Sequence, residues 1–257
     1  IRQFLNSTTC KNELEVNGGT VESTTGNYAI WFQNASNNAN KGNITITEGN
    51  IGRVYVYSYK LESSGLNVNI TSSAVEELVS YMKDYALTEV NGEYVKAEAV
   101  AKVEDYYTAT LQEAINNYAY EGSTVTILKD IELTSPVVIP AGYELTIDLN
   151  GYTISGVDKN TTGNYELIQN NGALTIKDSV GTGAITLKAL NDRDFNYASA
   201  VIVSNPGSTL VVKEGTIEHI GGTDMAYAID VRTNGNAGDV KAIIEGGTIR
   251  STYRAIR

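Results

Sequence analysis

The residues that could catalyse a reaction are few in this chain. The one histidine, His219, lies between Glu218 and Ile220, just ahead of a pair of glycines. No pair of carboxylates recurs along the chain in a pattern that would supply an acid and a nucleophile. We therefore interpret His219 as a turn residue beside a strand, and we predict that the protein is not an enzyme.

Aspartate-rich loops are the next candidates, because carboxylates and carbonyl oxygens bind calcium. Asp192 and Asp194 flank Arg193, but their spacing does not match an EF-hand loop. Arg193 and Arg250 could act as lyase-type bases only beside a bound calcium ion and a uronate. A solvated loop accounts for the same residues, so we predict neither a metal ion nor another cofactor.

Aromatic side chains offer a different chemistry, because the apolar faces of pyranose sugars can stack on flat rings. The chain has 17 tyrosines and one tryptophan, Trp31. Tyr55, Tyr57 and Tyr59 alternate with other residues, so a strand here would place all three on one face. They could bind glycans, or they could cover the end of a coil and pack against residues 72–85. We favour the covering role.

The composition favours a turn-rich all-β protein and excludes several classes of partner. The chain has 24 glycines, 3 prolines and a charged fraction of 19%. Its net charge of -11 opposes binding to nucleic acid or to an acidic membrane, whose phosphates would repel it. Cys10 has no second cysteine in the chain, so we interpret it as a buried or incidental thiol. No apolar run reaches the length of a membrane span.

Short strands recur at a regular spacing. An apolar-polar-apolar strand recurs every 24 to 36 residues, at 145–147, 174–176, 210–212 and 242–244, and again at 14–16, 44–46 and 68–70. Three short strands in each repeat, separated by Gly, Asn, Asp and Thr, are typical of a β-solenoid. The matched spacing predicts one inward column of Ile147, Ile176, Val212, Ile244, Val16 and Ile46.

The two ends of the chain read as halves of one strand. Residues 227–232 are Tyr-Ala-Ile-Asp-Val-Arg, and residues 254–257 followed by 1–2 read Arg-Ala-Ile-Arg-Ile-Arg. A third copy, at 28–33, reads Tyr-Ala-Ile-Trp-Phe-Gln. Stacking the copies predicts inner columns of Ile229, Ile256 and Ile30 and of Val231, Ile1 and Phe32, and an outer column of Asp230, Arg257 and Trp31. The outer column would place an arginine between a carboxylate and an indole ring.

One segment interrupts the solenoid pattern. Residues 72–85 combine a capping serine, an acidic residue soon after it and apolar residues at helical spacing, which predicts an amphipathic helix. Residues 86–90 and 93–97 flank Asn-Gly, the dipeptide most typical of a tight β-hairpin. Residues 110–117 predict a second, short helix, and a strand at 123–128 then reopens the solenoid.

Three segments resemble a known family. They are Thr-Leu-Gln-Glu-Ala-Ile at 110–115, the strand at 122–127 and Leu-Thr-Ile-Asp-Leu-Asn-Gly-Tyr-Thr-Ile at 145–154. These resemble the N-terminal cap and first coils of right-handed parallel β-helix proteins of the pectate-lyase-like superfamily. They are similar above all to the cap-and-coil modules of bacterial secreted and cell-surface repeat proteins. The resemblance implies the fold, whereas this fold carries lyases, hydrolases, esterases and adhesins alike. The Gly-His-Gly element of polygalacturonase-like enzymes is missing around His219.

The sequence therefore predicts an all-β, right-handed parallel β-helix, or β-solenoid, with a small helix and hairpin connector. Residues 124–257 would form the N-terminal half of the solenoid, residues 1–70 its C-terminal half, and residues 71–123 the connector and caps. We expect a structural subunit or repeat of an extracellular bacterial fibre or cell-surface adhesin, associating head to tail with copies of itself, with glycans as further candidate partners. A polysaccharide-active β-helix enzyme and a carbohydrate-binding module are the alternatives. The expected assembly surface comprises Ile1, Arg2, Phe4, Val16, Val21, Ile30, Trp31, Phe32, Ile249, Tyr253, Ile256 and Arg257.

Overall fold

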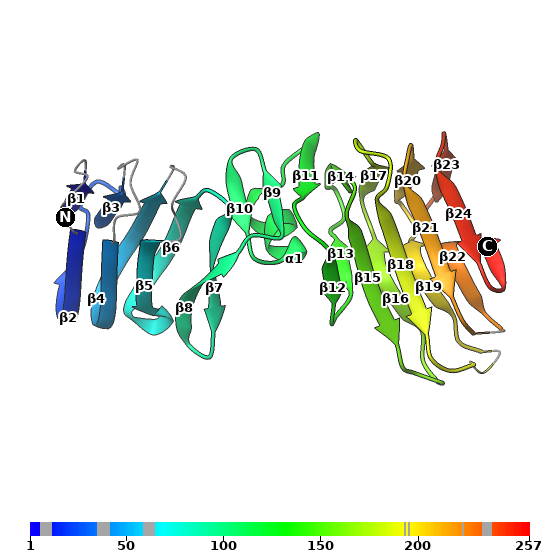
Figure 1. Ribbon diagram of the computed structural model, residues 1–257, viewed down its shortest axis with the longest axis horizontal. Helices are drawn as coiled ribbons and strands as arrows, with labels where there is room; N and C mark the ends of the chain where they lie inside the picture. The colour runs from blue at the N-terminus through cyan, green and yellow to red at the C-terminus, as the bar shows by residue number, and fades with distance from the viewer. Residues whose placement is uncertain are drawn as a thin grey trace. The chain divides into compact units, whose positions relative to one another are not determined.

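The computed structural model shows a chain built almost entirely from β-strands (Figure 1). The structure describes residues 1–5, 12–34, 42–58, 65–192, 194, 196–222, 224–232 and 238–257. Its contacts divide the chain into two compact units, Ile1–Thr110 and Leu111–Arg257. Cys10, Tyr59 and Arg193 lie outside the described residues, so what the sequence predicts for them stays a prediction.

The second unit consists of parallel sheets in which every third strand pairs with the next. One sheet contains β11 (Ser123–Ile127), β14 (Glu144–Asp148), β17 (Ala173–Lys177), β20 (Thr209–Val212) and β23 (Lys241–Ile244). Another contains β12 (Ile131–Leu133), β15 (Thr153–Asp158), β18 (Ala184–Ala189), β21 (Thr216–Ile220) and β24 (Thr248–Ser251). The last contains β13 (Val137–Ile139), β16 (Tyr165–Asn170), β19 (Ser199–Ser204), β22 (Ala226–Val231) and β25 (Arg254–Ile256). Three consecutive strands thus make one coil, and the stacked coils fit a β-solenoid.

The register of these coils confirms much of the predicted inward column. Ile147 pairs with Ile176, Ile176 with Val212, and Val212 with Ile244. The first three side chains are fully buried, whereas Ile244 in the last coil is 41% exposed. Burying such a side chain completely stabilises a fold by about 1.5–3 kcal/mol, so the column holds the coils together.

The first unit contains a second set of parallel ladders. Its strands are β1 (Arg2–Leu5), β2 (Asn12–Val21), β3 (Ile30–Asn34), β4 (Gly42–Ser58), β5 (Leu66–Thr71), β6 (Val75–Met82), β7 (Tyr85–Val90), β8 (Glu93–Glu98), β9 (Ala101–Val103) and β10 (Tyr106–Thr108). The long strand β4 belongs to both ladders, because its first half pairs with β2 and β5 and its second half with β3 and β6. Strands β4, β5, β8, β7 and β6 close into a five-stranded barrel.

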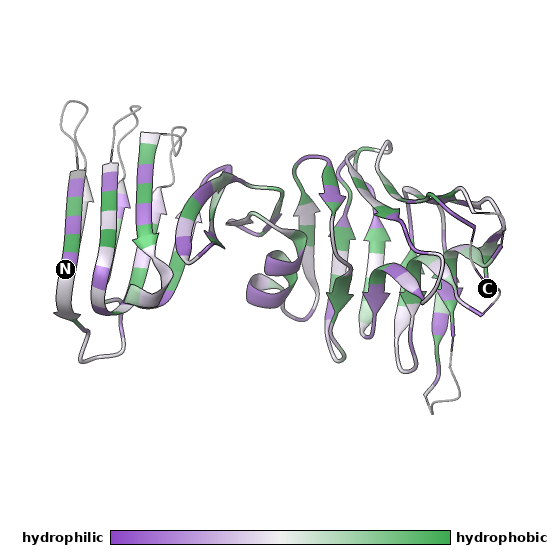
Figure 2. Cartoon of the chain, turned by 90° about the horizontal axis from the view of Figure 1, so that it is seen from below, coloured by the Kyte–Doolittle hydropathy of each residue, from purple (hydrophilic) through white to green (hydrophobic). Residues whose placement is uncertain are grey.

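Alternating hydropathy explains why these segments are strands. In Figure 2, hydrophobic and hydrophilic bands alternate along the strands of the first unit, as expected when successive side chains point to opposite faces. Val16 pairs with Ile46 and Ile46 with Ile70, and all three contribute to the buried core of this unit. Within one chain the predicted column is therefore present in two parts, one in each unit, and its continuation from Ile244 to Val16 stays a prediction.

The predicted helix at 72–85 is wrong. The structure has a 3₁₀ turn η2 (Ser72–Ala74) followed by strand β6, which pairs in parallel with β4. The apolar spacing of this segment fits a strand as well as a helix. The backbone hydrogen bonds of β4 favour the strand, and the half-buried position of this strand suits β-branched and aromatic residues such as Val79 and Tyr81.

Two other local predictions are confirmed. Strands β7 and β8 form the expected hairpin, and Asn91 and Gly92 at its tip have φ values of 52° and 85°. This left-handed backbone at both positions is what an Asn-Gly turn provides. The short helix is also present, as α1 (Leu111–Glu113) continued by the π-helical segment η3 (Ala114–Tyr118).

Candidate functional site

The last coil of the second unit presents an uncovered edge. In the described part of the chain, β23 pairs with β20 alone, β24 with β21 alone and β25 with β22 alone. Ile244 and Ile256 are 41% and 46% exposed, although Val212 and Ile229 one coil earlier are fully buried. Ile249, paired with Ile217, is half-buried. The inward columns therefore run to the last coil and stop there without a cover.

The first strands of the first unit form a second uncovered edge. Among the described residues, β1 pairs with β3 alone and β2 with β4 alone. Ile1 is 59% exposed, Val21 is half-buried, and Val16 is 9% exposed. The backbone of Phe4, in the edge strand β1, lies opposite Gln33 of β3.

The other end of each unit is closed. Gln112 covers the first coil of the second unit: its side-chain amide donates to the carbonyl oxygen of Val138 at 3.0 Å and accepts from the Val138 N–H at 2.7 Å. Leu111 and Ile115 of the same helix are buried. In the first unit, β8 pairs antiparallel with β5, placing Tyr94 opposite Ile70. Exposed strand edges associate readily, so the two uncovered coils are the candidate assembly surfaces.

Arg257 lies at the uncovered edge of the second unit and pairs with the buried carboxylate of Asp230. Its guanidinium donates to both carboxylate oxygens of Asp230, at 2.8 and 2.7 Å, and lies 4.5 Å from the centre of the Tyr227 ring. Arg232 Nε lies 2.9 Å from the same carboxylate and Arg232 Nη2 lies 2.8 Å from Glu166. Burial lowers the pKa of Arg257, but the contacts with Asp230 outweigh burial and raise it above its usual value. The predicted stacking of Arg257 on Asp230 is confirmed.

The predicted position of Ile1 is wrong by two residues. Arg2 pairs with Trp31, the Trp31 N–H donates to the carbonyl oxygen of Ile1 at 2.8 Å, and the Ile1 ammonium donates to Ala29 at 2.6 Å. Ile1 therefore lies beside Ile30 and not beside Phe32. A shift of two residues keeps every side chain on its predicted face, so the alternating pattern alone does not distinguish the two registers.

The remaining residues of the expected assembly surface differ in how exposed their side chains are. Ile30 and Phe32 are fully buried in β3, one coil in from the edge, so they support the surface and do not form it. Trp31 faces outward at 36% exposure, with the Arg2 guanidinium 5.6 Å from its ring. Tyr253 lies at the edge of the second unit and contacts Tyr227 edge to face at 5.9 Å. Ile244 is an edge residue that sequence reasoning left out of the surface, although its place in the inward column could have revealed it.

The candidate catalytic histidine lies in the core of the second unit. His219 is inside β21 and buried, so its assignment to a turn is wrong. Its Nε2 lies 2.9 Å from Ser199 Oγ, which donates to Asp158 at 2.6 Å. All three residues are about 1% exposed, so they form a polar core network closed to a substrate. The sequence carries no signal for this cluster, because its members come from three different coils.

The other polar candidates lie on the surface. Asp192 and Asp194 are exposed, and Arg250 pairs with Glu218 at 3.1 Å on neighbouring strands. In the described ranges, no group of three or more His, Cys, Asp or Glu side chains could hold a metal ion.

Aromatic rings form a continuous surface in the first unit. We call this surface the aromatic stripe; it consists of Tyr28, Trp31, Tyr55, Tyr57, Tyr81 and Tyr106. Tyr28 and Tyr55 stack at 4.8 Å, and Tyr57 and Tyr81 stack at 5.1 Å. The sequence placed Tyr55 and Tyr57 against the segment 72–85; Tyr57 does stack on Tyr81 of that segment, but the segment is a strand and not the predicted helix. The rings lie on the outer face of the ladder, where each is half-buried or 36% exposed.

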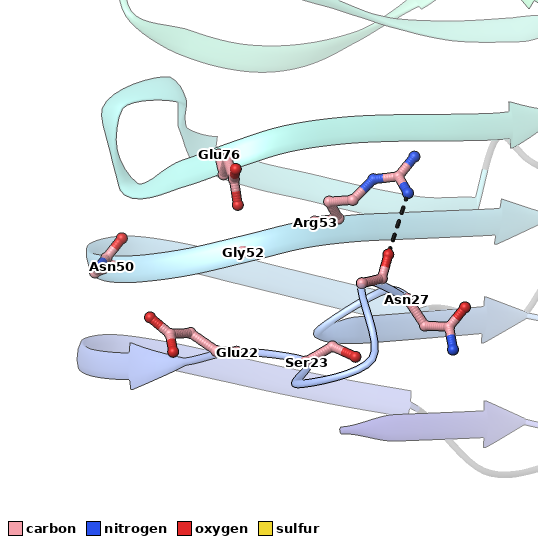
Figure 3. Close-up of a pocket in the computed structure, with 8 residues that line it drawn as sticks. Glu22, Ser23, Asn27, Asn50, Gly52, Arg53 and Glu76 are labelled. Carbon is pink, nitrogen blue, oxygen red and sulfur yellow. Dashed lines mark hydrogen bonds between the residues drawn. The ribbon is translucent and has the colours of Figure 1, made fainter.

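A polar pocket of about 270 Å³ lies next to the stripe and is lined by the loop between β2 and β3 and by residues of β4 and β6 (Figure 3). Gly52 is one of its lining residues, and Glu22 and Glu76 lie on either side of that glycine in Figure 3. Arg53 also lines the pocket and lies 5.0 Å from the centre of the Tyr28 ring. One side chain therefore connects the pocket with the aromatic stripe.

No long apolar helix of membrane-spanning character occurs among the described residues. Nothing among protein-family models, curated proteins or solved structures matches this chain. Its functional assignment therefore depends on the two uncovered coil edges, the aromatic stripe and the pocket.

Proposed function

We propose that the protein is a structural subunit or repeat of an extracellular bacterial fibre or surface adhesin. In this proposal, the last coil of one copy is covered by the first coil of the next, so that one right-handed β-helix continues from copy to copy. The observation that carries the proposal is that each unit has one uncovered coil edge and one closed end. Two different uncovered coils that fit each other favour head-to-tail association of copies. Such association does not close on itself and produces a filament.

The two uncovered coils have matching sequences. Residues 242–249 read Ala-Ile-Ile-Glu-Gly-Gly-Thr-Ile, and residues 14–21 read Leu-Glu-Val-Asn-Gly-Gly-Thr-Val. Gly247 and Gly19 bend the two segments with φ values of 82° and 84°, and Gly215 bends the preceding coil with 88°. A left-handed bend of this kind favours glycine. The coil at 14–21 therefore has the form expected of the coil that would follow 242–249.

The spacing across the join matches the spacing within the chain. If residue 1 of the next copy is counted directly after residue 257, Gly247 and Gly19 are 29 residues apart, and so are Ile249 and Val21. The same step relates Arg2 to Trp31 in the observed register of β1 and β3. Stacking the coils in this register would bury Ile244 and Ile256 and would pair the free backbone groups of both edges. Each newly buried isoleucine contributes up to about 1.5–3 kcal/mol, which is enough to drive association.

The test compares a charge at the edge with a charge elsewhere. Ile256→Asp or Ile244→Asp places an unpaired carboxylate in the join, whereas Val180→Asp changes a side chain that is 62% exposed in a turn. We expect filaments of the wild-type protein and of Val180→Asp by negative-stain electron microscopy and sedimentation. The two edge variants should weaken assembly at least about a hundredfold with an unchanged circular dichroism spectrum. Normal assembly of the edge variants, or a wild-type protein that stays monomeric at high concentration, would refute the proposal.

A further inference from the structure

The aromatic stripe has the geometry of a binding platform. Trp31 pairs with Tyr55 across β3 and β4, and Tyr57 pairs with Tyr81 across β4 and β6, so strand register holds the rings in place. Val54 and Val56, which alternate with these tyrosines, are fully buried in the core. The rings therefore cover the outer face of a ladder whose inner face is already packed. Flat apolar rings with polar edges suit the faces of sugar rings, and rigid ones lose little conformational entropy on binding.

The pocket adds hydrogen-bonding groups at one side of the stripe. Glu22, Ser23, Asn27, Asn50, Arg53 and Glu76 line it. Gly52 lines the pocket without a side chain; a Cβ there would meet Ala29, Val21 and Glu76 at ordinary contact distances of 3.4–3.8 Å, so a larger residue would take up space between these groups. An apolar platform beside a small set of polar groups is the composition expected of a ligand site.

The charge of the pocket selects among sugars. Arg53 is engaged by Glu77, with its Nε 2.7 Å and its Nη2 3.0 Å from the carboxylate oxygens. The hydrogen bond to Glu77 is the main reason that the pKa of Arg53 is raised. Glu22 and Glu76 therefore determine the charge of the pocket, and the chain as a whole carries a net charge of -11. Both features repel uronates and attract ammonium groups.

We propose that the aromatic stripe and the adjoining pocket bind a polysaccharide of amino sugars. The pyranose faces lie on the rings, and an ammonium group of the sugar lies between Glu22 and Glu76. An ammonium group also gains from the faces of tyrosine and tryptophan rings. The site uses none of the residues at the uncovered edge of the second unit, whereas Glu22 and Trp31 lie beside the uncovered edge of the first unit.

Trp31 provides a direct readout, since it is the one tryptophan of the chain and belongs to the stripe. A glucosamine hexamer at mildly acidic pH should shift its fluorescence, and added salt should weaken binding because the charge contact is screened. An N-acetylglucosamine hexamer, which has the same rings without the charge, should bind more weakly. A galacturonate hexamer should bind weakest.

Variants separate the stacking contact from the charge contact. Tyr57→Leu should lower the affinity for both hexosamine hexamers about threefold to tenfold, whereas Tyr57→Phe, which keeps the ring, should not. Glu76→Gln should lower only the affinity for the glucosamine hexamer, and Gly52→Val, which fills the pocket, should lower that affinity as well. Tyr152→Ala, which removes an exposed tyrosine of the second unit, is the matched control and should leave binding unchanged.

Thermal unfolding of each variant verifies that a loss of binding is not a loss of fold. The proposal is overturned by an unchanged Trp31 signal with the glucosamine hexamer, by equal binding of wild type and Tyr57→Leu, or by tighter binding of galacturonate. Equal binding of the two hexosamine hexamers together with no effect of Glu76→Gln would overturn the assignment to amino sugars.

Discussion

At the scale of single residues, Asp148 shows how one buried carboxylate fixes the turns of two coils. Its Oδ1 accepts from the N–H groups of Asn150 and Ser179, both at 3.0 Å, and Lys177 Nζ lies 3.2 Å from its Oδ2. Asn150 adopts a left-handed φ of 49°, which the first of these bonds helps to hold. Burial raises the pKa of Asp148, but these hydrogen bonds outweigh it and lower the pKa below its usual value.

The first prediction concerns acid. Because the pKa of Asp148 is lower in the folded than in the unfolded state, its stabilising contribution is present above the unfolded pKa of about 3.9 and is lost as pH falls through the folded pKa. Asp148→Asn should lower the free energy of unfolding by about 1–3 kcal/mol at neutral pH. It should also flatten the dependence of that free energy on pH in the acidic range. Urea unfolding measured across that range checks this.

Glu121→Gln is the matched control, because Glu121 is an exposed carboxylate of the same unit. It should leave the acid dependence unchanged. An acid dependence of Asp148→Asn equal to that of the wild type would contradict the assignment.

At the scale of elements, Gln112 explains how the second unit begins. Among the described strands β13 pairs with β16 alone, and the amide of Gln112 supplies its other edge with a donor and an acceptor, as another strand would do. The same side-chain nitrogen donates to Asn116 at 2.9 Å, which holds the amide in place on its helix. The side chain of Gln112 therefore caps the parallel sheet at its first strand, β13.

The second prediction concerns this cap. Gln112→Ala leaves the N–H and the carbonyl oxygen of Val138 without their partner and should lower the free energy of unfolding by about 1–3 kcal/mol. Gln112→Glu keeps the acceptor and loses the donor, so its effect should be smaller. Urea unfolding midpoints for the two variants check the order. Equal midpoints for wild type and Gln112→Ala would show that the cap carries no stability.

At the scale of the whole molecule, the two units have separate cores. The core of the first unit includes Ile30, Phe32, Ile46 and Val56, and contacts divide the chain after Thr110. The second unit has its own inward column from Ile147 to Val212. A core within each unit is what independent folding requires.

The third prediction follows from these cores. Residues 111–257 expressed alone should keep a β-sheet circular dichroism spectrum and should unfold cooperatively with heat. Ile147→Asp in the same fragment places an unpaired charge in the column and should abolish that transition. A wild-type fragment that is unfolded would show that the second unit depends on the first.

The parts of the fold that depend on local spacing could be predicted from the sequence. The step from Ile147 to Ile176 and Val212 is visible in the sequence, because each coil repeats the same alternation of apolar and polar residues. The Asn91-Gly92 hairpin could also be predicted from the sequence, since few residues accept a left-handed backbone at two successive positions. The candidate edge residue Ile256 followed from the same repeat.

The tertiary structure alone decided features that depend on partners far away in the chain. Residues 75–82 became a strand because β4 supplies backbone hydrogen bonds that local spacing does not encode. Ile1 came to lie beside Ile30 because registers two residues apart place the same side chains on the same faces. The buried contact of His219 with Ser199 and the joining of Tyr28, Tyr55 and Arg53 at one surface likewise arise only when separate coils stack. Local sequence sets which face a side chain occupies, whereas pairing between coils sets what it meets there.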